Sequence, residues 1–159
     1  MNAKELISYL NLIPHPEGGY YKETYRSNDL SVTNIGNKRN LSTAIYYLLE
    51  GLDKSHLHRI QSDELWFFHA GKPLEVVFIE NGIWKSIVLG LDLANGEIPQ
   101  AMIPAGLWFG SHIKEQKGFC LVSCTVAPGF DFNDFEMANR DELSIIYPHL
   151  SEKIKLFSK

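Results

Sequence analysis

Residues 51–71, GLDKSHLHRIQSDELWFFHAG, carry the pattern that decides the fold. His56 and His58 are two residues apart, and this spacing places both imidazoles on the same face of a β-strand. Glu64 can join them from the next strand across a turn. Two nitrogens and one carboxylate that converge in this way suit Zn, Mn, Fe or Ni. The pattern therefore predicts neighbouring strands that enclose an interior site.

Short runs rich in β-branched and aromatic residues fill most of the remaining chain. Gly, Asn, Asp or Pro separates them about every 8–12 residues, which is the rhythm of an all-β sandwich or barrel. We therefore predict an all-β fold. The runs are STAIYYLLE (42–50), DELWFFHAG (63–71), PLEVVFIE (73–80), GIWKSIVLG (82–90), QAMIPAG (100–106), LWFGSHI (107–113) and GFCLVSCTVAPGF (118–130).

The two ends of the chain have a different pattern. Residues 3–11 have the apolar spacing of a short amphipathic helix, and residues 20–25 form a further strand-like run. Residues 28–40 are polar and contain Gly and Asn, which predicts a loop or a hairpin. Residues 134–159 return to helical spacing, with Asp141 as the expected N-cap of the helix.

Length and charge limit the class of protein. With 159 residues the chain is expected to form one domain, 1–159, with a core at about residues 12–136. The net charge of −4 is spread along the sequence, and Lys38-Arg39 is the largest basic cluster, so we expect no nucleic-acid partner. No apolar run reaches the roughly 18 residues of a membrane span. The N-terminus lacks a signal core, which predicts a cytoplasmic protein without a membrane partner.

Cys120 and Cys124 lie four residues apart in one predicted strand. That separation is about 13 Å along a strand, beyond the roughly 7 Å between Cα atoms that a disulfide allows. We expect two buried free thiols, which fits a reducing compartment.

The opening motif resembles the first cupin motif, in which a glycine leads into His-x-His, a later Glu and a closing Gly. The six residues between Glu64 and Gly71 match that family, whereas five residues separate His58 from Glu64 and Gly51 is one residue too close to His56. PAGLWF (104–109) resembles the second motif, but Phe109 occupies the position of the fourth metal ligand.

HPEGGYYKETYRS (15–27) and CTVAPGFDFNDFE (124–136) extend the resemblance to one small single-domain cupin family. The resemblance implies a double-stranded β-helix, or jelly roll, with a short N-terminal helix and a small C-terminal helical segment. It also implies a homodimer, and its distant structural relatives include deoxy-sugar epimerases and germins.

By analogy with cupin epimerases, His58 is the candidate catalytic base and Glu64 the residue that orients it or tunes its pKa. The candidate acid is Tyr46 or Tyr47, of which only one can face inward. The expected wall of a small-molecule pocket consists of His56, Trp66, Phe68, Trp108 and Phe109.

Three further segments carry open alternatives. His15 and Glu17 serve the site, cap the barrel or meet a second subunit. Arg26 either binds a carboxylate or phosphate at the barrel mouth or lies on the surface. In the 130–135 segment, we expect the phenylalanines to attach the chain to the barrel and the aspartates to cap a turn.

Three functions follow from these residues. The first is isomerase- or epimerase-like chemistry on a sugar or sugar-nucleotide derivative, without a metal cofactor. The second is a metal-dependent enzyme in which His56, His58 and Glu64 bind a divalent ion. The third is a metabolite-binding module without catalysis, because no nucleophile elbow and no Gly-rich phosphate loop is present.

Overall fold

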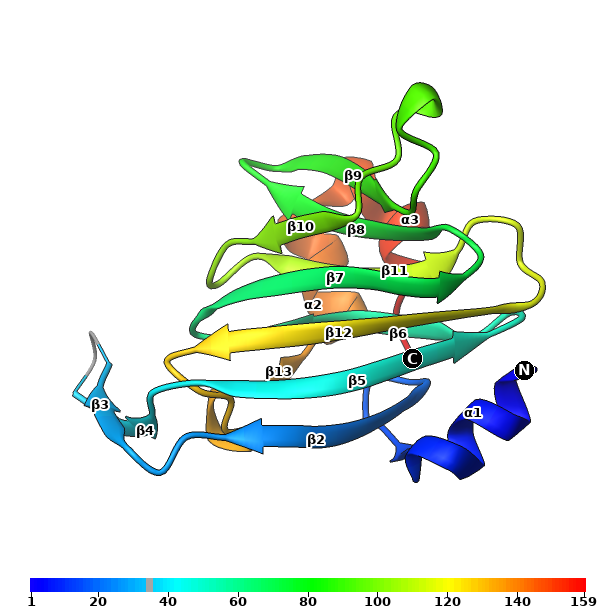
Figure 1. Ribbon diagram of the computed structural model, residues 1–159. Coiled ribbons are helices and arrows are strands. Elements are labelled where there is room, and N and C mark those ends of the chain that lie inside the picture. The colour runs from blue at the N-terminus through cyan, green and yellow to red at the C-terminus, as the bar shows by residue number, and fades with distance from the viewer. Residues whose placement is uncertain (34–35) are drawn as a thin grey trace.

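The computed structural model describes residues 1–33 and 36–159, and two antiparallel sheets face each other in it (Figure 1). The six-stranded sheet has the order β1 (Ile13–Pro14), β2 (Tyr20–Arg26), β5 (Thr43–Glu50), β12 (Phe119–Ala127), β7 (Asp63–Gly71) and β10 (Gln100–Ile103). The five-stranded sheet has the order β13 (Glu136–Met137), β6 (Lys54–Arg59), β11 (Trp108–Ile113), β8 (Leu74–Glu80) and β9 (Ile83–Leu89).

The chain alternates between the two sheets from β5 to β8, so that β6 and β7 lie in opposite layers. His58 and Glu64 therefore approach each other across the interior and not along one sheet. The main core fills the same space, and its largest side chains are Tyr47, Trp66 and Phe109. All seven predicted strand runs contain a strand, and the expected all-β fold is confirmed.

The predicted hairpin at residues 28–40 has its two strands at β3 (Leu30–Val32) and β4 (Lys38–Asn40), which pair antiparallel. Residues 34–35, which fall within that prediction, lie outside the described residues.

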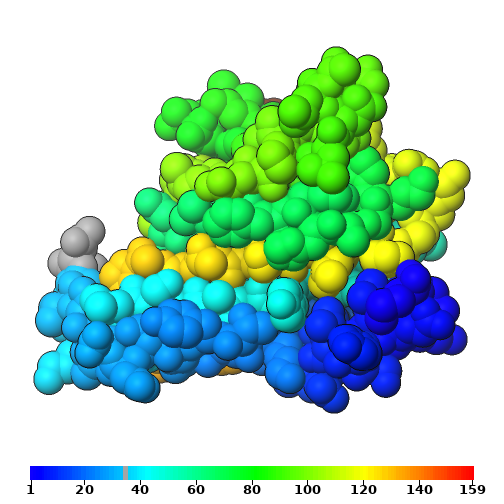
Figure 2. Space-filling model, in the orientation of Figure 1, coloured from blue at the N-terminus to red at the C-terminus, as the bar shows by residue number. Residues whose placement is uncertain are grey.

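Helices cover the ends and one outer face of the sandwich. Helix α1 (Ala3–Leu10) begins at Asn2, whose side chain forms a capping box with Glu5, and it packs over Leu48 and Leu121. In Figure 2 the side chains of α1, in dark blue, cover one end of the face formed by β2, β5, β12 and β7. No helix among the described residues is long and apolar enough to cross a membrane.

The C-terminal helices α2 (Arg140–Ile146) and α3 (Ser151–Leu156) cover the outer face of the five-stranded sheet (Figure 1). The prediction of Asp141 as N-cap was wrong, because Asn139 accepts the backbone N–H groups of Asp141 and Glu142. Asp141 lies inside the first turn, where its charge favours the helix dipole. Within the part of the chain that the structure describes, the remaining helices are short 3₁₀ turns: η1 (Leu93–Asn95), η2 (Phe132–Asp134) and η3 (Pro148–Leu150).

Strand β6 contains the irregularity that shapes the interior. His58 pairs with Phe109 and Ser55 with Ser111, so two residues of β6, His56 and Leu57, oppose Gly110 alone. A Cβ atom on Gly110 would lie 2.5 Å from the carbonyl oxygen of Ser55, so a larger residue does not fit there. A bulge of this kind interrupts the two-residue alternation of a strand. As a result, Ser55 and His58 share a face although they are three residues apart.

Candidate functional site

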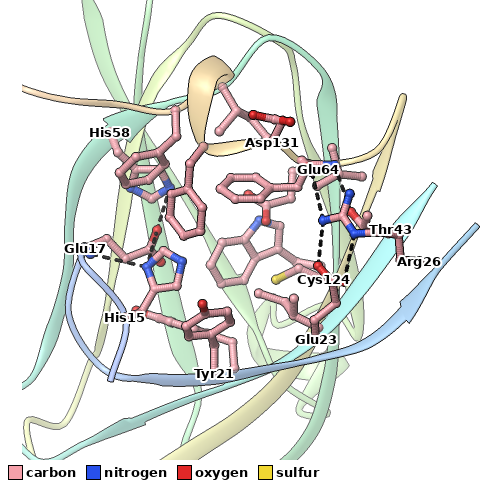
Figure 3. Close-up of a pocket in the computed structure, with 18 residues that line it drawn as sticks. His15, Glu17, Tyr21, Glu23, Arg26, Thr43, His58, Glu64, Cys124 and Asp131 are labelled. Carbon is pink, nitrogen blue, oxygen red and sulfur yellow. Dashed lines mark hydrogen bonds and ion pairs between the residues drawn. The ribbon is translucent and has the colours of Figure 1, made fainter. Parts of the chain in front are cut away.

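A cavity of about 480 Å³ opens between the two sheets (Figure 3). In Figure 3, His15, Glu17 and His58 lie on one side, while Glu23, Arg26, Glu64 and Cys124 lie on the other. The complete lining consists of His15, Glu17, Tyr21, Glu23, Arg26, Thr43, Ile45, Tyr47, His58, Ile60, Glu64, Trp66, Cys124, Val126, Phe130, Asp131, Phe132 and Phe135.

The loop from His15 to Gly19 carries one side of the cavity and is docked tightly on β6. The backbone N–H of His56 donates to the Glu17 carbonyl at 2.8 Å. Gly18 has a φ of +115°, and a Cβ atom there would lie 2.0 Å from the carbonyl oxygen of Lys54. Only glycine permits this approach. The HPEGG sequence thus fixes Glu17 against the bulged strand.

Glu17 is the centre of the polar cluster, although its residue is only 6% exposed. The Ser55 hydroxyl donates to its Oε1 at 3.0 Å. Its Oε2 lies 3.1 Å from Nε2 of His58 and 3.4 Å from Nδ1 of His15. A buried carboxylate with such partners keeps the polar contacts that burial would otherwise remove.

The contacts of His58 show which of its ring nitrogens carries a hydrogen. Nδ1 lies 2.8 Å from the carbonyl oxygen of His56 and must carry a hydrogen, because a carbonyl only accepts. Nε2 lies 3.1 Å from Glu17 Oε2, a contact that is an ion pair when the imidazole is protonated. His58 therefore presents its second ring nitrogen to the Glu17 carboxylate at the wall of the cavity.

In His15, by contrast with His58, Nδ1 accepts a hydrogen bond. The backbone N–H of Glu17 donates to its Nδ1 at 3.3 Å, so this nitrogen is unprotonated. Burial lowers the pKa of His15, and the charge of Glu17 opposes that change only in part. His15 is a neutral imidazole at neutral pH and packs against the ring of Tyr21 at 4.5 Å.

Glu64 lies on β7 across the cavity from the His58–Glu17 pair and is 8% exposed. Burial, followed by the negative charge of Glu17, raises the pKa of Glu64 from 4.5 to about 8. It forms no ion pair with any residue that the structure describes. At neutral pH it is a carboxylic acid able to donate a proton or a hydrogen bond.

The buried phenol and thiol groups in and beside the cavity are held neutral. Burial raises the pKa of Tyr47, whose hydroxyl donates to the Gly18 carbonyl at 2.7 Å and so anchors the loop. Cys120 and Cys124 are buried free thiols, and Cys124 lines the cavity. Burial raises the pKa of both thiols, to about 12 for Cys120, so neither is a reactive thiolate.

Comparison with known proteins places this site in a family. Residues 4–138 match the family described as cupin superfamily (DUF985). The chain belongs to the cupin superfamily. A crystal structure of protein SO0799 from Shewanella oneidensis is 41% identical, with a TM-score of 0.92 and coverage of 100% of this chain and 98% of that chain. A hypothetical protein from Leishmania major is 37% identical, with a TM-score of 0.94 and coverage of 99% of both chains. The protein YML079W from Saccharomyces cerevisiae is 35% identical over 161 residues, which cover 89% of this chain and 78% of that protein.

The cupin fold brings some of the predicted residues together and separates others. His58, Glu64 and Trp66 line the cavity, and Tyr47 faces it where Tyr46 does not. The indole N–H of Trp66 is buried and has no acceptor among the residues that are described.

The other four predicted wall residues do not line the cavity. Nδ1 of His56 lies 2.7 Å from the Glu17 carbonyl oxygen, so this ring holds the loop from behind. Phe109 is buried below His58, with ring centroids 4.2 Å apart. Phe68 packs into the core, and Trp108 lies under the C-terminal helices beside Arg59. The bulge in β6 explains why His56 does not face the cavity, because it interrupts the two-residue alternation that would place His56 and His58 on the same face.

The donor set does not fit the divalent metal of the second hypothesis. His56 is directed to a backbone carbonyl, and His58 uses its cavity nitrogen on Glu17. Phe109 stands at the fourth ligand position and packs on His58. Within residues 1–33 and 36–159, no group of three or more His, Cys, Asp or Glu side chains is arranged to hold a metal ion.

Much of the cavity of this cupin is lined by three segments whose roles the sequence left open. Glu17 is the partner of His58, and its signal is the HPEGG sequence, whose glycines require close backbone contact. Phe130, Phe132 and Phe135, here called the aromatic wall, line the cavity, and Phe130 and Phe135 also pack on the barrel. Asp131 accepts from the Asn133 backbone, which is the predicted turn cap.

Arg26 also lines the cavity, but its guanidinium is already engaged. Nε and an Nη donate to the two carboxylate oxygens of Glu23, at 2.8 and 2.7 Å. Its other contacts are the Asn40 side chain at 2.8 Å and the Phe130 carbonyl at 3.1 Å. Four of the hydrogen bonds that a guanidinium can donate are thus made within the protein.

Proposed function

We propose that this cupin catalyses an isomerase- or epimerase-type proton transfer on a sugar-sized carbonyl compound. The observation that carries the proposal is the His58–Glu17 pair, which faces a neutral Glu64 across one cavity. Two titratable groups held in different protonation states are what such chemistry requires of a site.

His58 is the base of the proposed reaction. In the neutral imidazole with hydrogen on Nδ1, the Nε2 lone pair takes the proton from the carbon next to the substrate carbonyl. The electron pair of that C–H bond forms the carbon–carbon double bond of an enol. The imidazolium that results remains 3.1 Å from the Glu17 carboxylate, which stabilises its charge.

Glu64 is the acid. Its proton passes to the carbonyl oxygen as the enol forms. In an isomerisation the His58 imidazolium then gives its proton to the former carbonyl carbon, and a hydroxyl of the enol returns a proton to Glu64 as the new carbonyl forms. In an epimerisation solvent supplies the proton to the opposite face of the same carbon, His58 releases its proton to solvent, and the enol hydroxyl returns its proton to Glu64. The aromatic wall and Trp66 surround the reactants with apolar surface, where such proton transfers are least disturbed by water.

The size and charge of the cavity limit the class of substrate that it can bind. A volume of about 480 Å³ suits a single sugar or a compound of similar size. Because Arg26 already binds Glu23, the cavity offers no free guanidinium for a pyrophosphate group. We therefore favour a sugar-sized compound over a sugar nucleotide.

The test is exchange of substrate hydrogen with solvent. Candidate aldoses, ketoses and amino-carbonyl compounds are incubated with the protein in D₂O, and deuterium entry next to the carbonyl is followed by proton NMR. The variant His58→Gln should lower the exchange rate by at least about 100-fold, the usual contribution of a positioned base.

A matched control is His69→Gln, since His69 lies outside the cavity and contacts Ser123 on the other face of the sheet. This variant should exchange at the wild-type rate. Exchange that persists unchanged in His58→Gln, or its absence with every carbonyl compound, would contradict the proposal.

A further inference from the structure

We infer that the ligand of this cavity is an organic cation, whose ammonium group lies between the aromatic wall and the carboxylate of Asp131. The inference rests on the proposed function, because the cation is taken to be the substrate of the same cavity. It adds the charge of that substrate, which the proton-transfer proposal leaves open.

The charge balance of the lining is the first argument. Among the described residues, the lining contains the carboxyl groups of Glu17, Glu23, Glu64 and Asp131 but only one basic side chain that is always charged, Arg26. Glu23 neutralises Arg26 at 2.7 Å, and its donors are engaged. Glu64 is protonated at neutral pH, and Glu17 lies against Ser55 and His58. The negative charge that the lining leaves for a ligand is therefore that of Asp131, which favours a cation and disfavours an anion.

Asp131 places part of this charge beside the aromatic wall. Its carboxylate accepts from the backbone and side chain of Asn133, both at 2.8 Å, and stays ionised at neutral pH. In Figure 3 it lies at the opposite end of the cavity from Tyr21. Nε of Arg39 forms a long ion pair with Asp131 Oδ2, at 4.0 Å, and lies much closer to Asp134 Oδ2, at 2.6 Å. Asp131 therefore retains charge that a ligand can use.

The aromatic wall is the second argument. The ring centroids of its members lie 5.0 to 6.0 Å apart in edge-to-face contacts, so the three rings form one continuous surface. Phe132 also stacks on His15, with centroids 6.2 Å apart, and it is half exposed at 52%. Aromatic faces carry negative electrostatic potential, and their combination with carboxylates is typical of sites for quaternary ammonium groups.

The proposed chemistry supplies the third argument. Negative charge develops on the substrate as the proton leaves carbon and until Glu64 has protonated the carbonyl oxygen. Apart from the His58 imidazolium, the described lining has no free cationic side chain to stabilise that charge. A positive group on the substrate would do so from within. A cationic carbonyl compound therefore suits both the walls and the reaction.

The test compares two probes of the same shape and different charge. Choline carries a quaternary ammonium, and 3,3-dimethylbutan-1-ol is its neutral isostere. Binding of each to the wild-type protein is measured by isothermal titration calorimetry, with glucose 1-phosphate as an anionic probe. Choline should bind at least about 10-fold more tightly than the isostere, and glucose 1-phosphate should bind more weakly than either.

A pair of variants locates the cation. Phe132→Leu should weaken choline binding by about 3- to 30-fold and leave the isostere nearly unchanged. Phe67→Leu makes the same substitution outside the cavity lining and should leave the binding of both probes unchanged. Circular dichroism of each variant confirms that the loss does not come from unfolding.

Equal or tighter binding of the neutral isostere, preference for the anion, or no binding of choline at 10 mM would each overturn the inference. These outcomes are separate from the proposed function, because deuterium exchange on a neutral carbonyl compound can persist when choline does not bind. Conversely, choline binding without any exchange would support the cation site and count against the proton transfer.

Discussion

Glu17 and Glu64 occupy opposite sides of one cavity and are buried to almost the same extent, at 6% and 8% exposed. Glu17 has a serine hydroxyl and two imidazoles around its carboxylate. Glu64 has no ion pair among the described residues, and burial together with the charge of Glu17 raises its pKa to about 8. Equal burial thus leaves Glu64 protonated and surrounds Glu17 with polar partners, because the neighbouring side chains differ.

The difference shows how one fold prepares an acid and a base in the same space. The loop that carries Glu17 comes from outside the core strands and brings a carboxylate to a histidine. The strand that carries Glu64 is part of the sandwich and offers it only apolar and weakly polar neighbours. The three predictions below test this contrast, in order of the expected effect.

The largest effect concerns the pH dependence of stability. The folded protein retains the Glu64 proton up to about pH 8, whereas the unfolded chain releases it near pH 4.5. The folded state therefore binds more protons between these values, and the free energy of unfolding falls as the pH rises from about 4.5 to about 8. This difference in pKa corresponds to a loss of at most roughly 5 kcal/mol in the free energy of unfolding.

The measurement is urea unfolding of the wild type and of Glu64→Gln at pH 5 and pH 8. The variant lacks the titrating group, so wild-type stability should fall relative to it across this range. A constant difference between the two proteins at both pH values would show that Glu64 is ionised throughout.

The second effect concerns the partner of His58. In Glu17→Gln the imidazolium loses its carboxylate, while an amide of the same shape still accepts from Ser55. We expect deuterium exchange on an active carbonyl compound to fall by about 100-fold, or roughly 3 kcal/mol.

The matched variant is Glu136→Gln, because Glu136 is an exposed glutamate paired with Arg59 outside the cavity. It should retain the wild-type exchange rate. If both variants lose the same activity, the effect of Glu17→Gln is one of general stability and the base assignment fails.

The smallest effect lies far from both carboxyl groups. Asn139→Ala removes the side-chain cap of α2 and should lower the free energy of unfolding by about 1 kcal/mol. Exchange should not change, since α2 covers the outer face of the five-stranded sheet. Thermal unfolding and NMR exchange on the same sample check both parts, and a larger loss for Asp141→Ala would restore the sequence-based choice of cap.

Most of the strands could be predicted from the sequence, because β-branched runs and turn residues act locally. The sequence predicts that Glu64 joins His58 from the next strand across a turn. That the two strands lie in facing layers depends on the long-range pairing of β6 with β11 and of β7 with β12. The bulge at His56 and Leu57 could not be predicted, since it depends on Gly110 of a strand distant in sequence. For the same reason His-x-His suggests two inward imidazoles where only one lines the cavity.

Residues in loops show a second limit of prediction from the sequence. Asn139 and Asp141 are both good N-caps, and only the backbone geometry selects between them. Glu17 and the aromatic wall gain their roles from contacts with β6 and β2 that no local pattern encodes. The cavity is therefore harder to predict than the sandwich around it.

The contrast between the two carboxyl groups can be measured directly by carbon-13 NMR of glutamate side-chain carboxyl groups during a pH titration. The resonance of Glu64, assigned by its absence in Glu64→Gln, should titrate near pH 8. The resonance of Glu17, assigned in the same way, should respond to His58→Gln. A Glu64 resonance that titrates near 4.5, like those of exposed glutamates, would contradict the assignment of Glu64 as the acid and with it the central claim.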